Sequence, residues 1–243
     1  MKHNIILDLD ECLIHSILYS DIQTNKNIQN AKFSSYEREL EERGIYMNIF
    51  KYAFINNRIE YSVTYRRPYL KEFIKYLFDN YNVSVWSNGY YTYVDKICSL
   101  IFTKIQKKKL KNIFGAKLDN KNMIVYNIKT KKILYNLGEK KGCKDLSYLF
   151  NNKPYNKTYT IENTILIDDS INHLEFNKTN VINVKKWYFY NNKDTILLHI
   201  IDYLKKNSKD INTMKLNNFT KIRGVKKTRK KKHQTKASKT YIR

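Results

Sequence analysis

Residues 5 to 12 of this 243-residue chain read Ile-Ile-Leu-Asp-Leu-Asp-Glu-Cys, and this stretch decides the fold. The apolar run Ile5 to Leu7 is short and rich in β-branched residues, which predicts a buried strand. Two carboxylates, Asp8 and Asp10, follow it at once. Such a pair can hold a divalent cation and divide the roles of nucleophile and general acid. The same pattern also occurs in an ordinary strand-ending turn or helix N-cap.

Three further segments have the same strand-like character, namely Val83 to Trp86, Thr164 to Ile167 and Val181 to Val184. Between them, apolar residues recur with the spacing of a helical stripe. The predicted helices start near Leu70, near Val94, near Asp145 and after an N-cap at Asp194. Strand and helix in alternation predict an α/β fold with a doubly wound parallel sheet.

Two β-prone runs, residues 45 to 55 and 58 to 65, interrupt this alternation. Asn56 and Asn57, which separate them, tolerate the positive φ angles of a tight turn. The pattern predicts a β-hairpin inserted in the α/β fold, and this hairpin is a candidate platform for a substrate. The polar segment before it, residues 21 to 44, predicts a surface helix or loop.

Polar residues also follow two of the other predicted strands. Ser87-Asn88-Gly89 comes after the second strand, and Asp168-Asp169-Ser170 comes after the third. Because ligand groups gather at the carboxyl ends of parallel strands, we expect these side chains near Asp8. Ser-Asn-Gly alone is an ordinary turn, whereas adjacent carboxylates are costly to hold together without a cation or a basic partner. The combination favours a metal-assisted phosphoryl site.

Composition excludes several classes of protein. Apolar residues make up 42% of the chain, and no apolar run approaches the roughly 18 residues of a membrane span. Cys12, Cys98 and Cys143 are scattered without a C-x-x-C pair, so we predict free thiols. The first strand begins so early that no room is left for a signal peptide, and the cytosol or nucleus is the expected location.

The net charge of +24 is unevenly distributed. Residues 221 to 243 hold 11 Lys or Arg residues, no acid, and no helical or strand periodicity. We predict a folded domain over residues 1–206 and a basic, disordered tail over residues 207–243. The tail is either a solvated polycation without a specific role, or a segment that directs nuclear localisation or tethers the protein to nucleic acid or chromatin.

The order and content of these motifs resemble the haloacid dehalogenase superfamily, and within it the NLI-interacting-factor-like, or RNA polymerase II C-terminal-domain, phosphatases. Residues 8 to 16 are similar to that family's D-L-D-E-T-L-V-H-S signature. Further matches follow in the family's order: Arg67-Pro68, Ser87 with Tyr93 and Asp95, Lys144-Asp145-Leu146-Ser147, Ile165 to Ser170, and Val184-x-x-Trp187. The resemblance covers residues 3 to about 205.

The resemblance implies a phosphatase that forms an aspartyl-phosphate and acts on phosphoserine or phosphothreonine in proteins. Asp8 would be the nucleophile, and Asp10 would protonate the leaving alcohol and then activate water. Ser87, Asn88 and Lys144 would bind the substrate's phosphoryl group, where prepositioned donors stabilise developing charge.

The resemblance also implies Mg²⁺ as the cofactor. Its ligands would be the Asp8 carboxylate, the Asp10 backbone carbonyl and Asp169, because this ion prefers oxygen ligands in octahedral geometry. Asp168 would then orient Lys144 or a metal-bound water. The sequence leaves open which of Asp168 and Asp169 contacts the ion.

Two positions depart from the family's pattern without removing a reacting group: Cys12 replaces Thr, and Ile171 replaces Pro. The lysine-rich segment 102–142 is divergent and receives no assignment. Two other functions stay open. A phosphatase acting on nucleic-acid ends would use the same chemistry and explain the basic charge, and a catalytically silent binding protein could share the fold.

Overall fold

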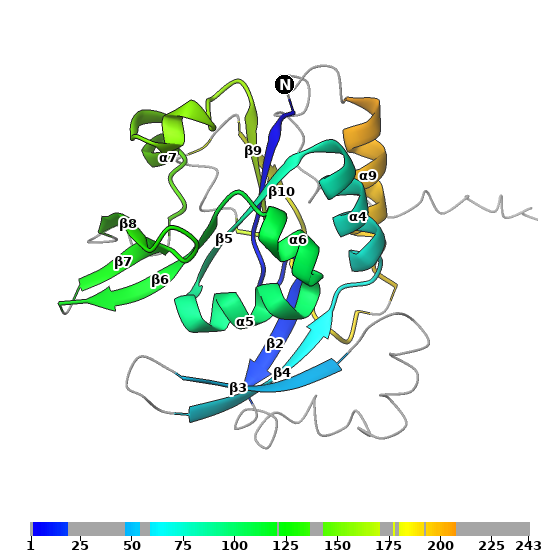
Figure 1. Cartoon of the computed structure of the whole chain (residues 1–243). Coiled ribbons are helices and arrows are strands. Elements are labelled where there is room, and N and C mark those ends of the chain that lie inside the picture. The colour runs from blue at the N-terminus through cyan, green and yellow to red at the C-terminus, as the bar shows by residue number, and fades with distance from the viewer. Residues whose placement is uncertain are drawn as a thin grey trace, which may run out of the picture.

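A computed structural model describes residues 2–18, 47–53, 59–120, 122–136, 143–170, 177, 180–191 and 193–207 (Figure 1). The predicted Asn56-Asn57 turn, the polar segment 21–44, Ile171 and the tail from residue 208 lie outside these ranges. The disorder of the tail and the domain boundary at residue 206 therefore stay predictions. In the part of the chain that is described, no helix is long and apolar enough to cross a membrane.

Within the described residues, seven strands form a central sheet in the order β10-β9-β1-β5-β6-β7-β8. Their bounds are β1 Asn4–Leu7, β5 Asn82–Tyr90, β6 Ile113–Asp119, β7 Asn122–Asn127, β8 Lys132–Asn136, β9 Thr164–Asp168 and β10 Val181–Asn183. The strands from β10 to β6 are parallel, whereas β7 and β8 are antiparallel. The predicted parallel α/β sheet is confirmed in its centre, and an antiparallel edge extends it.

Helices cover both faces of the central sheet. They are α4 Leu70–Asn80, α5 Tyr91–Ile101, α6 Lys104–Lys109, α7 Ser147–Asn151, α9 Ile196–Lys206 and the 3-10 helix η1 Tyr155–Lys157. Successive residues of a strand point to opposite faces, so Ile5 and Leu7 pack with α4, α5 and α9, whereas Ile6 packs with α7 and η1. Two buried faces make the sheet doubly wound, as predicted. Figure 1 shows α4 and α9 packed side by side.

The inserted hairpin is part of a second sheet with the strand order β2-β4-β3. Its strands are β2 Ile14–Leu18, β3 Met47–Ala53 and β4 Ile59–Arg66. The antiparallel pairing of β3 with β4 confirms the predicted hairpin, and β2, which the sequence did not predict, pairs with β4. In Figure 1 this sheet lies below the central sheet, on the side where β1 ends.

The lysine-rich segment 102–142 holds further elements that the sequence did not predict, namely α6 and the strands β6 to β8. In two of these strands burial does not follow the period of two that marks a half-buried strand. In β6 the four neighbours Ile113 to Ala116 are all buried, and in β8 the neighbours Lys132 and Ile133 are both exposed. The alternation by which such strands are predicted is therefore missing.

Arg67 is fully buried and joins three parts of the chain. Its guanidinium donates two hydrogen bonds of 2.9 Å to the Asp194 carboxylate. Two more go to the carbonyl of Cys12 at 2.7 Å and to that of Lys185 at 3.1 Å. The guanidinium of Arg67 thus bonds both the turn after β1 and the start of α9. Its pair with the Asp194 carboxylate has the bidentate geometry that makes such ion pairs strong.

This pairing corrects the prediction that Asp194 is the N-cap of the last helix. Thr195 occupies the cap position of α9. Asp194 does accept the backbone N–H of Ile196 at 3.2 Å, but it also forms the buried ion pair with Arg67. The sequence could not reveal the partner because 127 residues separate the two side chains.

Replacing Arg67 with Met is expected to lower the free energy of unfolding by about 3–5 kcal/mol, because Asp194 would stay buried without its partner. The double variant Arg67→Met, Asp194→Leu should recover part of this loss, since no uncompensated charge remains. Urea unfolding followed by circular dichroism measures both values. A loss below about 1 kcal/mol in the single variant would show that the ion pair does not stabilise the fold.

Candidate active site

Three neighbouring strands of the central sheet carry the predicted polar residues at one edge. Asp8 directly follows β1, Asp168 is the last residue of β9, and Ser87 lies near the end of β5. β1 pairs in parallel with both β5 and β9. These strand ends therefore meet at the same edge of the sheet, where ligand groups gather in folds of this class.

Lys144 lies between two of these carboxylates. Its Nζ is 2.5 Å from Asp8 Oδ1 and 2.7 Å from Asp168 Oδ2, and all three residues are buried. Burial alone would lower the pKa of Lys144, but the carboxylates of Asp168 and Asp8 raise it above its ordinary value. Lys144 is therefore a fixed positive charge at the edge of the sheet.

The backbone around Lys144 is held by Asn177, a residue that sequence analysis did not single out. The side-chain amide of Asn177 donates to the Lys144 carbonyl at 2.6 Å and accepts from the backbone N–H of Leu146 at 2.9 Å. Asn177 is buried and lies 33 residues beyond Lys144. In a chain rich in asparagine, no local pattern marks this contact.

Asp8, Asp168 and Asp169 each place a carboxylate oxygen within 4.8 Å of the other two. Burial, and then the charge of Asp168, raise the pKa of Asp8 well above its ordinary value, and Lys144 opposes this rise. Burial, and also Asp168, raise the pKa of Asp169. Lys144, together with Lys186 at 3.6 Å from Asp169 Oδ2, does not neutralise three carboxylates. The donor set therefore fits a divalent cation, which would relieve the remaining repulsion.

Asp168 and Asp169 differ in their protein partners. Asp168 accepts hydrogen bonds on both oxygens, from Lys144 at 2.7 Å and from the backbone N–H of Ser170 at 2.8 Å. Asp169 faces Lys186, whose Nζ is 3.6 Å from Asp169 Oδ2. The Asp168 carboxylate is thus committed to donors within the protein, while Asp169 is better able to bind another cation.

Among the described acidic residues, Asp10 stands outside this group of three carboxylates. It lies in the tight turn after β1, in which Glu11 has a positive φ of 53°. Tyr93 of α5 donates its hydroxyl to Asp10 Oδ1. Burial raises the pKa of Asp10 to about 6, and the Tyr93 hydrogen bond acts in the opposite direction. The two carboxylates of the first motif therefore have different partners and different surroundings.

Ser87 and Asn88 lie within β5, so the prediction of a strand ending at Trp86 is wrong. The pairing of β5 with β6 shifts between Trp86 and Tyr90, and a shift of this kind re-aims side chains at a sheet edge. Ser87 is buried and accepts a hydrogen bond from the Gly89 N–H at 2.9 Å, whereas Asn88 is exposed.

Cys12, where the family's pattern has Thr, is a packing residue. Its side chain is fully buried, and its Sγ donates a weak hydrogen bond of 3.8 Å to the Ile167 carbonyl. Burial raises the pKa of this thiol well above its ordinary value, so it stays neutral. Cys12, Cys98 and Cys143 are free thiols, as predicted.

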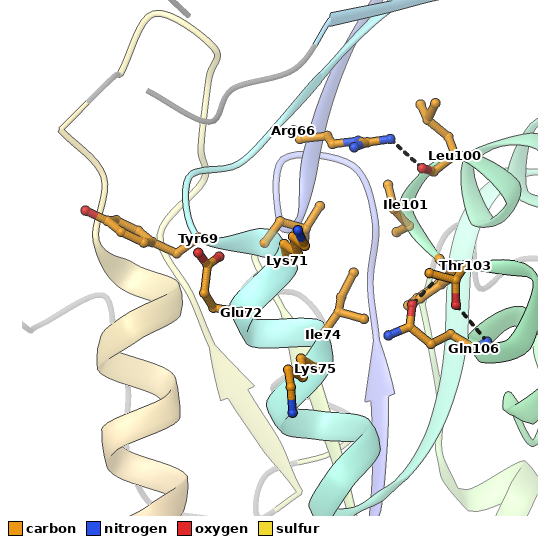
Figure 2. Close-up of a pocket in the computed structure, with 12 residues that line it drawn as sticks. Arg66, Tyr69, Lys71, Glu72, Ile74, Lys75, Leu100, Ile101, Thr103 and Gln106 are labelled. Carbon is orange, nitrogen blue, oxygen red and sulfur yellow. Dashed lines mark hydrogen bonds between the residues drawn. The ribbon is translucent and has the colours of Figure 1, made fainter. Parts of the chain in front are cut away.

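A cavity of about 700 Å³ lies between α4, the end of α5 and the start of α6 (Figure 2). Ile74 and Ile101 contribute to its apolar part, and Arg66, which donates to the Leu100 carbonyl, lies at its side. Its lining includes none of the predicted catalytic residues. The cluster of carboxylates around Lys144 lies at the edge of the central sheet and not in this cavity.

Curated proteins similar to this chain include two C-terminal-domain (CTD) phosphatase relatives. A protein of Invertebrate iridescent virus 6 described as CTD phosphatase-like, 355R, is 26% identical over 209 residues, which are 84% of this chain and 97% of that protein. The ubiquitin-like domain-containing CTD phosphatase 1 of Drosophila melanogaster is 22% identical over 202 residues. That match covers 81% of this chain and 59% of the fly protein.

Two solved structures of Fcp1, an RNA polymerase II CTD phosphatase, share the fold. One matches with a TM-score of 0.50 and 15% identity, covering 88% of this chain and 50% of that one. The other, a fission yeast Fcp1 variant bound to beryllium fluoride, matches with a TM-score of 0.51 and 15% identity, covering 89% and 52%. This chain thus spans about half the length of either structure. The family model for NLI interacting factor-like phosphatases matches residues 3–215, most of the chain. The protein therefore belongs to the NLI interacting factor-like phosphatase family.

Proposed function

We propose that this protein is a magnesium-dependent phosphatase that removes phosphate from serine or threonine residues of a protein substrate. The observation that carries the proposal is the buried ion cluster of Lys144 with Asp8 and Asp168, beside Asp169, at the carboxyl edge of a parallel sheet. Carboxylates and a fixed cation at such an edge suit phosphoryl transfer, in which positioning and charge stabilisation dominate. The CTD phosphatase relatives support a phosphoprotein as the substrate class.

Asp8 is the nucleophile in this proposal. Its carboxylate attacks phosphorus and forms an aspartyl-phosphate, while the bond between phosphorus and the serine oxygen breaks. Asp10 gives a proton to the departing oxygen. In the second step water attacks the aspartyl-phosphate, Asp10 takes a proton from that water, and inorganic phosphate leaves Asp8.

The phosphoryl oxygens are bound by Lys144, Ser87 and Asn88. Lys144 is suited to this role because its charge is fixed and its Nζ already lies 2.5 Å from Asp8 Oδ1. Ser87 and Asn88 come from the neighbouring strand end, where the irregular pairing of β5 with β6 sets their direction. Donors prepositioned in this way need little reorganisation as charge develops on the oxygens.

We assign Mg²⁺ to the Asp8 carboxylate, the Asp10 carbonyl and the Asp169 carboxylate, with Asp168 orienting Lys144. Asp169 is preferred over Asp168 because both Asp168 oxygens already accept hydrogen bonds within the protein. Bound there, the ion would offset the negative charge of the carboxylates and of the phosphoryl group.

We keep the predicted division into a phosphatase domain, residues 1–206, and a basic tail, residues 207–243, as part of this proposal. The family match extends to residue 215. Tethering of the tail to nucleic acid or chromatin, and a nuclear location, have no support from the similar proteins and rest on the tail's sequence alone.

Replacing Asp8 with Asn is expected to lower turnover of phosphoserine peptides at least about a thousandfold, because the amide is a poor nucleophile. The assay is phosphate release in the presence of Mg²⁺, and excess chelator should abolish the activity of the unmodified protein. The exposed residue Asp202 of α9 offers a matched control, since Asp202→Asn makes the same chemical change far from the cluster.

The same assay distinguishes the other two functions. Preference for a 5′- or 3′-phosphorylated oligonucleotide over the peptides, with steep salt dependence, would indicate a nucleic-acid end phosphatase. No turnover of any substrate would indicate a silent binding protein. Turnover that survives Asp8→Asn would refute the proposed nucleophile.

Replacing Asp169 with Asn is expected to weaken Mg²⁺ binding at least about a hundredfold, because a direct ligand is lost. The same change at Asp168 should weaken Mg²⁺ binding only about tenfold, within the range of an outer-shell residue. Isothermal titration with Mg²⁺ measures both affinities without relying on turnover. A larger loss for Asp168→Asn than for Asp169→Asn would reverse the two assignments.

A further inference from the structure

Side chains from three different elements form a continuous chain of hydrogen bonds that ends on Asp10. The hydroxyl of Tyr93, on α5, contacts Asp10 Oδ1 and lies 2.8 Å from Ser16 Oγ on β2. Ser16 Oγ lies 2.8 Å from Thr64 Oγ1 on β4. Ser16 and Thr64 are directly opposite each other in the antiparallel register. This series of hydrogen bonds therefore links the second sheet to Asp10.

The direction of each hydrogen bond follows from the number of protons. Tyr93 has one hydroxyl proton, and of Asp10 Oδ1 and Ser16 Oγ the carboxylate of Asp10 is the stronger acceptor. With that proton donated to Asp10, the Tyr93 oxygen would accept the Ser16 proton, and Ser16 Oγ would accept the Thr64 proton. Because Tyr93 and Ser16 would then both donate and accept, each of these hydrogen bonds polarises the next one.

Packing restrains two members of this series of hydrogen bonds, Tyr93 in its middle and Thr64 at the end away from Asp10. Tyr93 is 9% exposed, and its ring lies so close to β5 that a Cβ on Gly89 would be 2.8 Å from Tyr93 Cδ1. Thr64, at the other end, is fully buried. The Tyr93 ring thus has little room to turn, and glycine is the residue at position 89 that lets it come this close.

We propose that Tyr93 is a positioning residue for Asp10, and that Ser16 and Thr64 hold Tyr93 from the second sheet. This inference rests on the proposed function, in which Asp10 transfers the proton. Tyr93 keeps Oδ1 of Asp10 as a hydrogen-bond acceptor, so the proton that Asp10 transfers is carried by Oδ2. That proton passes from Oδ2 to the serine oxygen as the bond between this oxygen and phosphorus breaks, and Asp10 is left as the carboxylate.

The contribution of Tyr93 should depend on the leaving group. A serine alkoxide or a phenolate is a poor leaving group and needs the proton during bond cleavage, whereas p-nitrophenolate departs readily without it. Misplacement of the acid by a fraction of an ångström therefore slows the first two reactions and spares the third. A residue that only stabilised the fold would affect all three alike.

The test compares kcat/KM for p-nitrophenyl phosphate, phenyl phosphate and a phosphoserine peptide at saturating Mg²⁺. For each substrate, kcat/KM reports only the steps up to and including departure of the leaving group. Tyr93→Phe is expected to lose less than about threefold on p-nitrophenyl phosphate and about 10–100-fold on the other two substrates. Ser16→Ala, which keeps the Tyr93 ring, should show a smaller loss in the same order of substrates.

Tyr159→Phe is the matched control. The hydroxyl of Tyr159 is buried and bonded to Ser84 and Asn112, in a part of the core that does not touch Asp10. This variant should lower the melting temperature without changing the ratio of kcat/KM between the two aryl phosphates. Equal losses of Tyr93→Phe and Ser16→Ala on all three substrates would overturn the inference. Absence of turnover by the unmodified protein would overturn the proposed function, and the inference with it.

Discussion

Lys144 places its ammonium group 2.5 Å from Asp8 and 2.7 Å from Asp168, at the end of three parallel strands. Carboxylates this close repel each other, and their burial makes the repulsion stronger because little water screens it. The positive charge of Lys144 offsets the repulsion between the carboxylates, and their negative charges offset the cost of burying the lysine. With Asp169 within 4.8 Å, the balance is still negative. Under the proposed function, a divalent cation bound to these carboxylates would relieve the imbalance and help to hold a phosphoryl group.

Much of the fold serves to bring these charges together from distant parts of the chain. Parallel pairing of β1 with β5 and β9 sets Asp8, Ser87 and Asp168 at one edge. Lys144 comes from outside the sheet, and the buried amide of Asn177 fixes its backbone. Arg67 donates a hydrogen bond to the Cys12 carbonyl and so holds the turn after β1.

The strands β1, β9 and β10 and the helices α4, α5 and α9 could be predicted because each has an unbroken apolar run or stripe. The grouping of Asp8 with Asp168 and Asp169 followed from the rule that parallel strands end at a common edge. Contacts between single side chains could not be predicted in this way. Tyr93 lies 83 residues from Asp10, and nothing near either residue encodes their hydrogen bond. The strands β6 to β8 were missed for another reason, since buried and exposed residues do not alternate along β6 and β8.

The second sheet, whose hairpin the sequence suggested as a platform for a substrate, also contacts Tyr93 through Ser16. Under the proposed mechanism the nucleophile and the acid are held by different parts of the fold. Asp8 extends a central strand and is braced by Lys144, whereas Asp10 is oriented through Tyr93 by Ser16 and Thr64 of the second sheet.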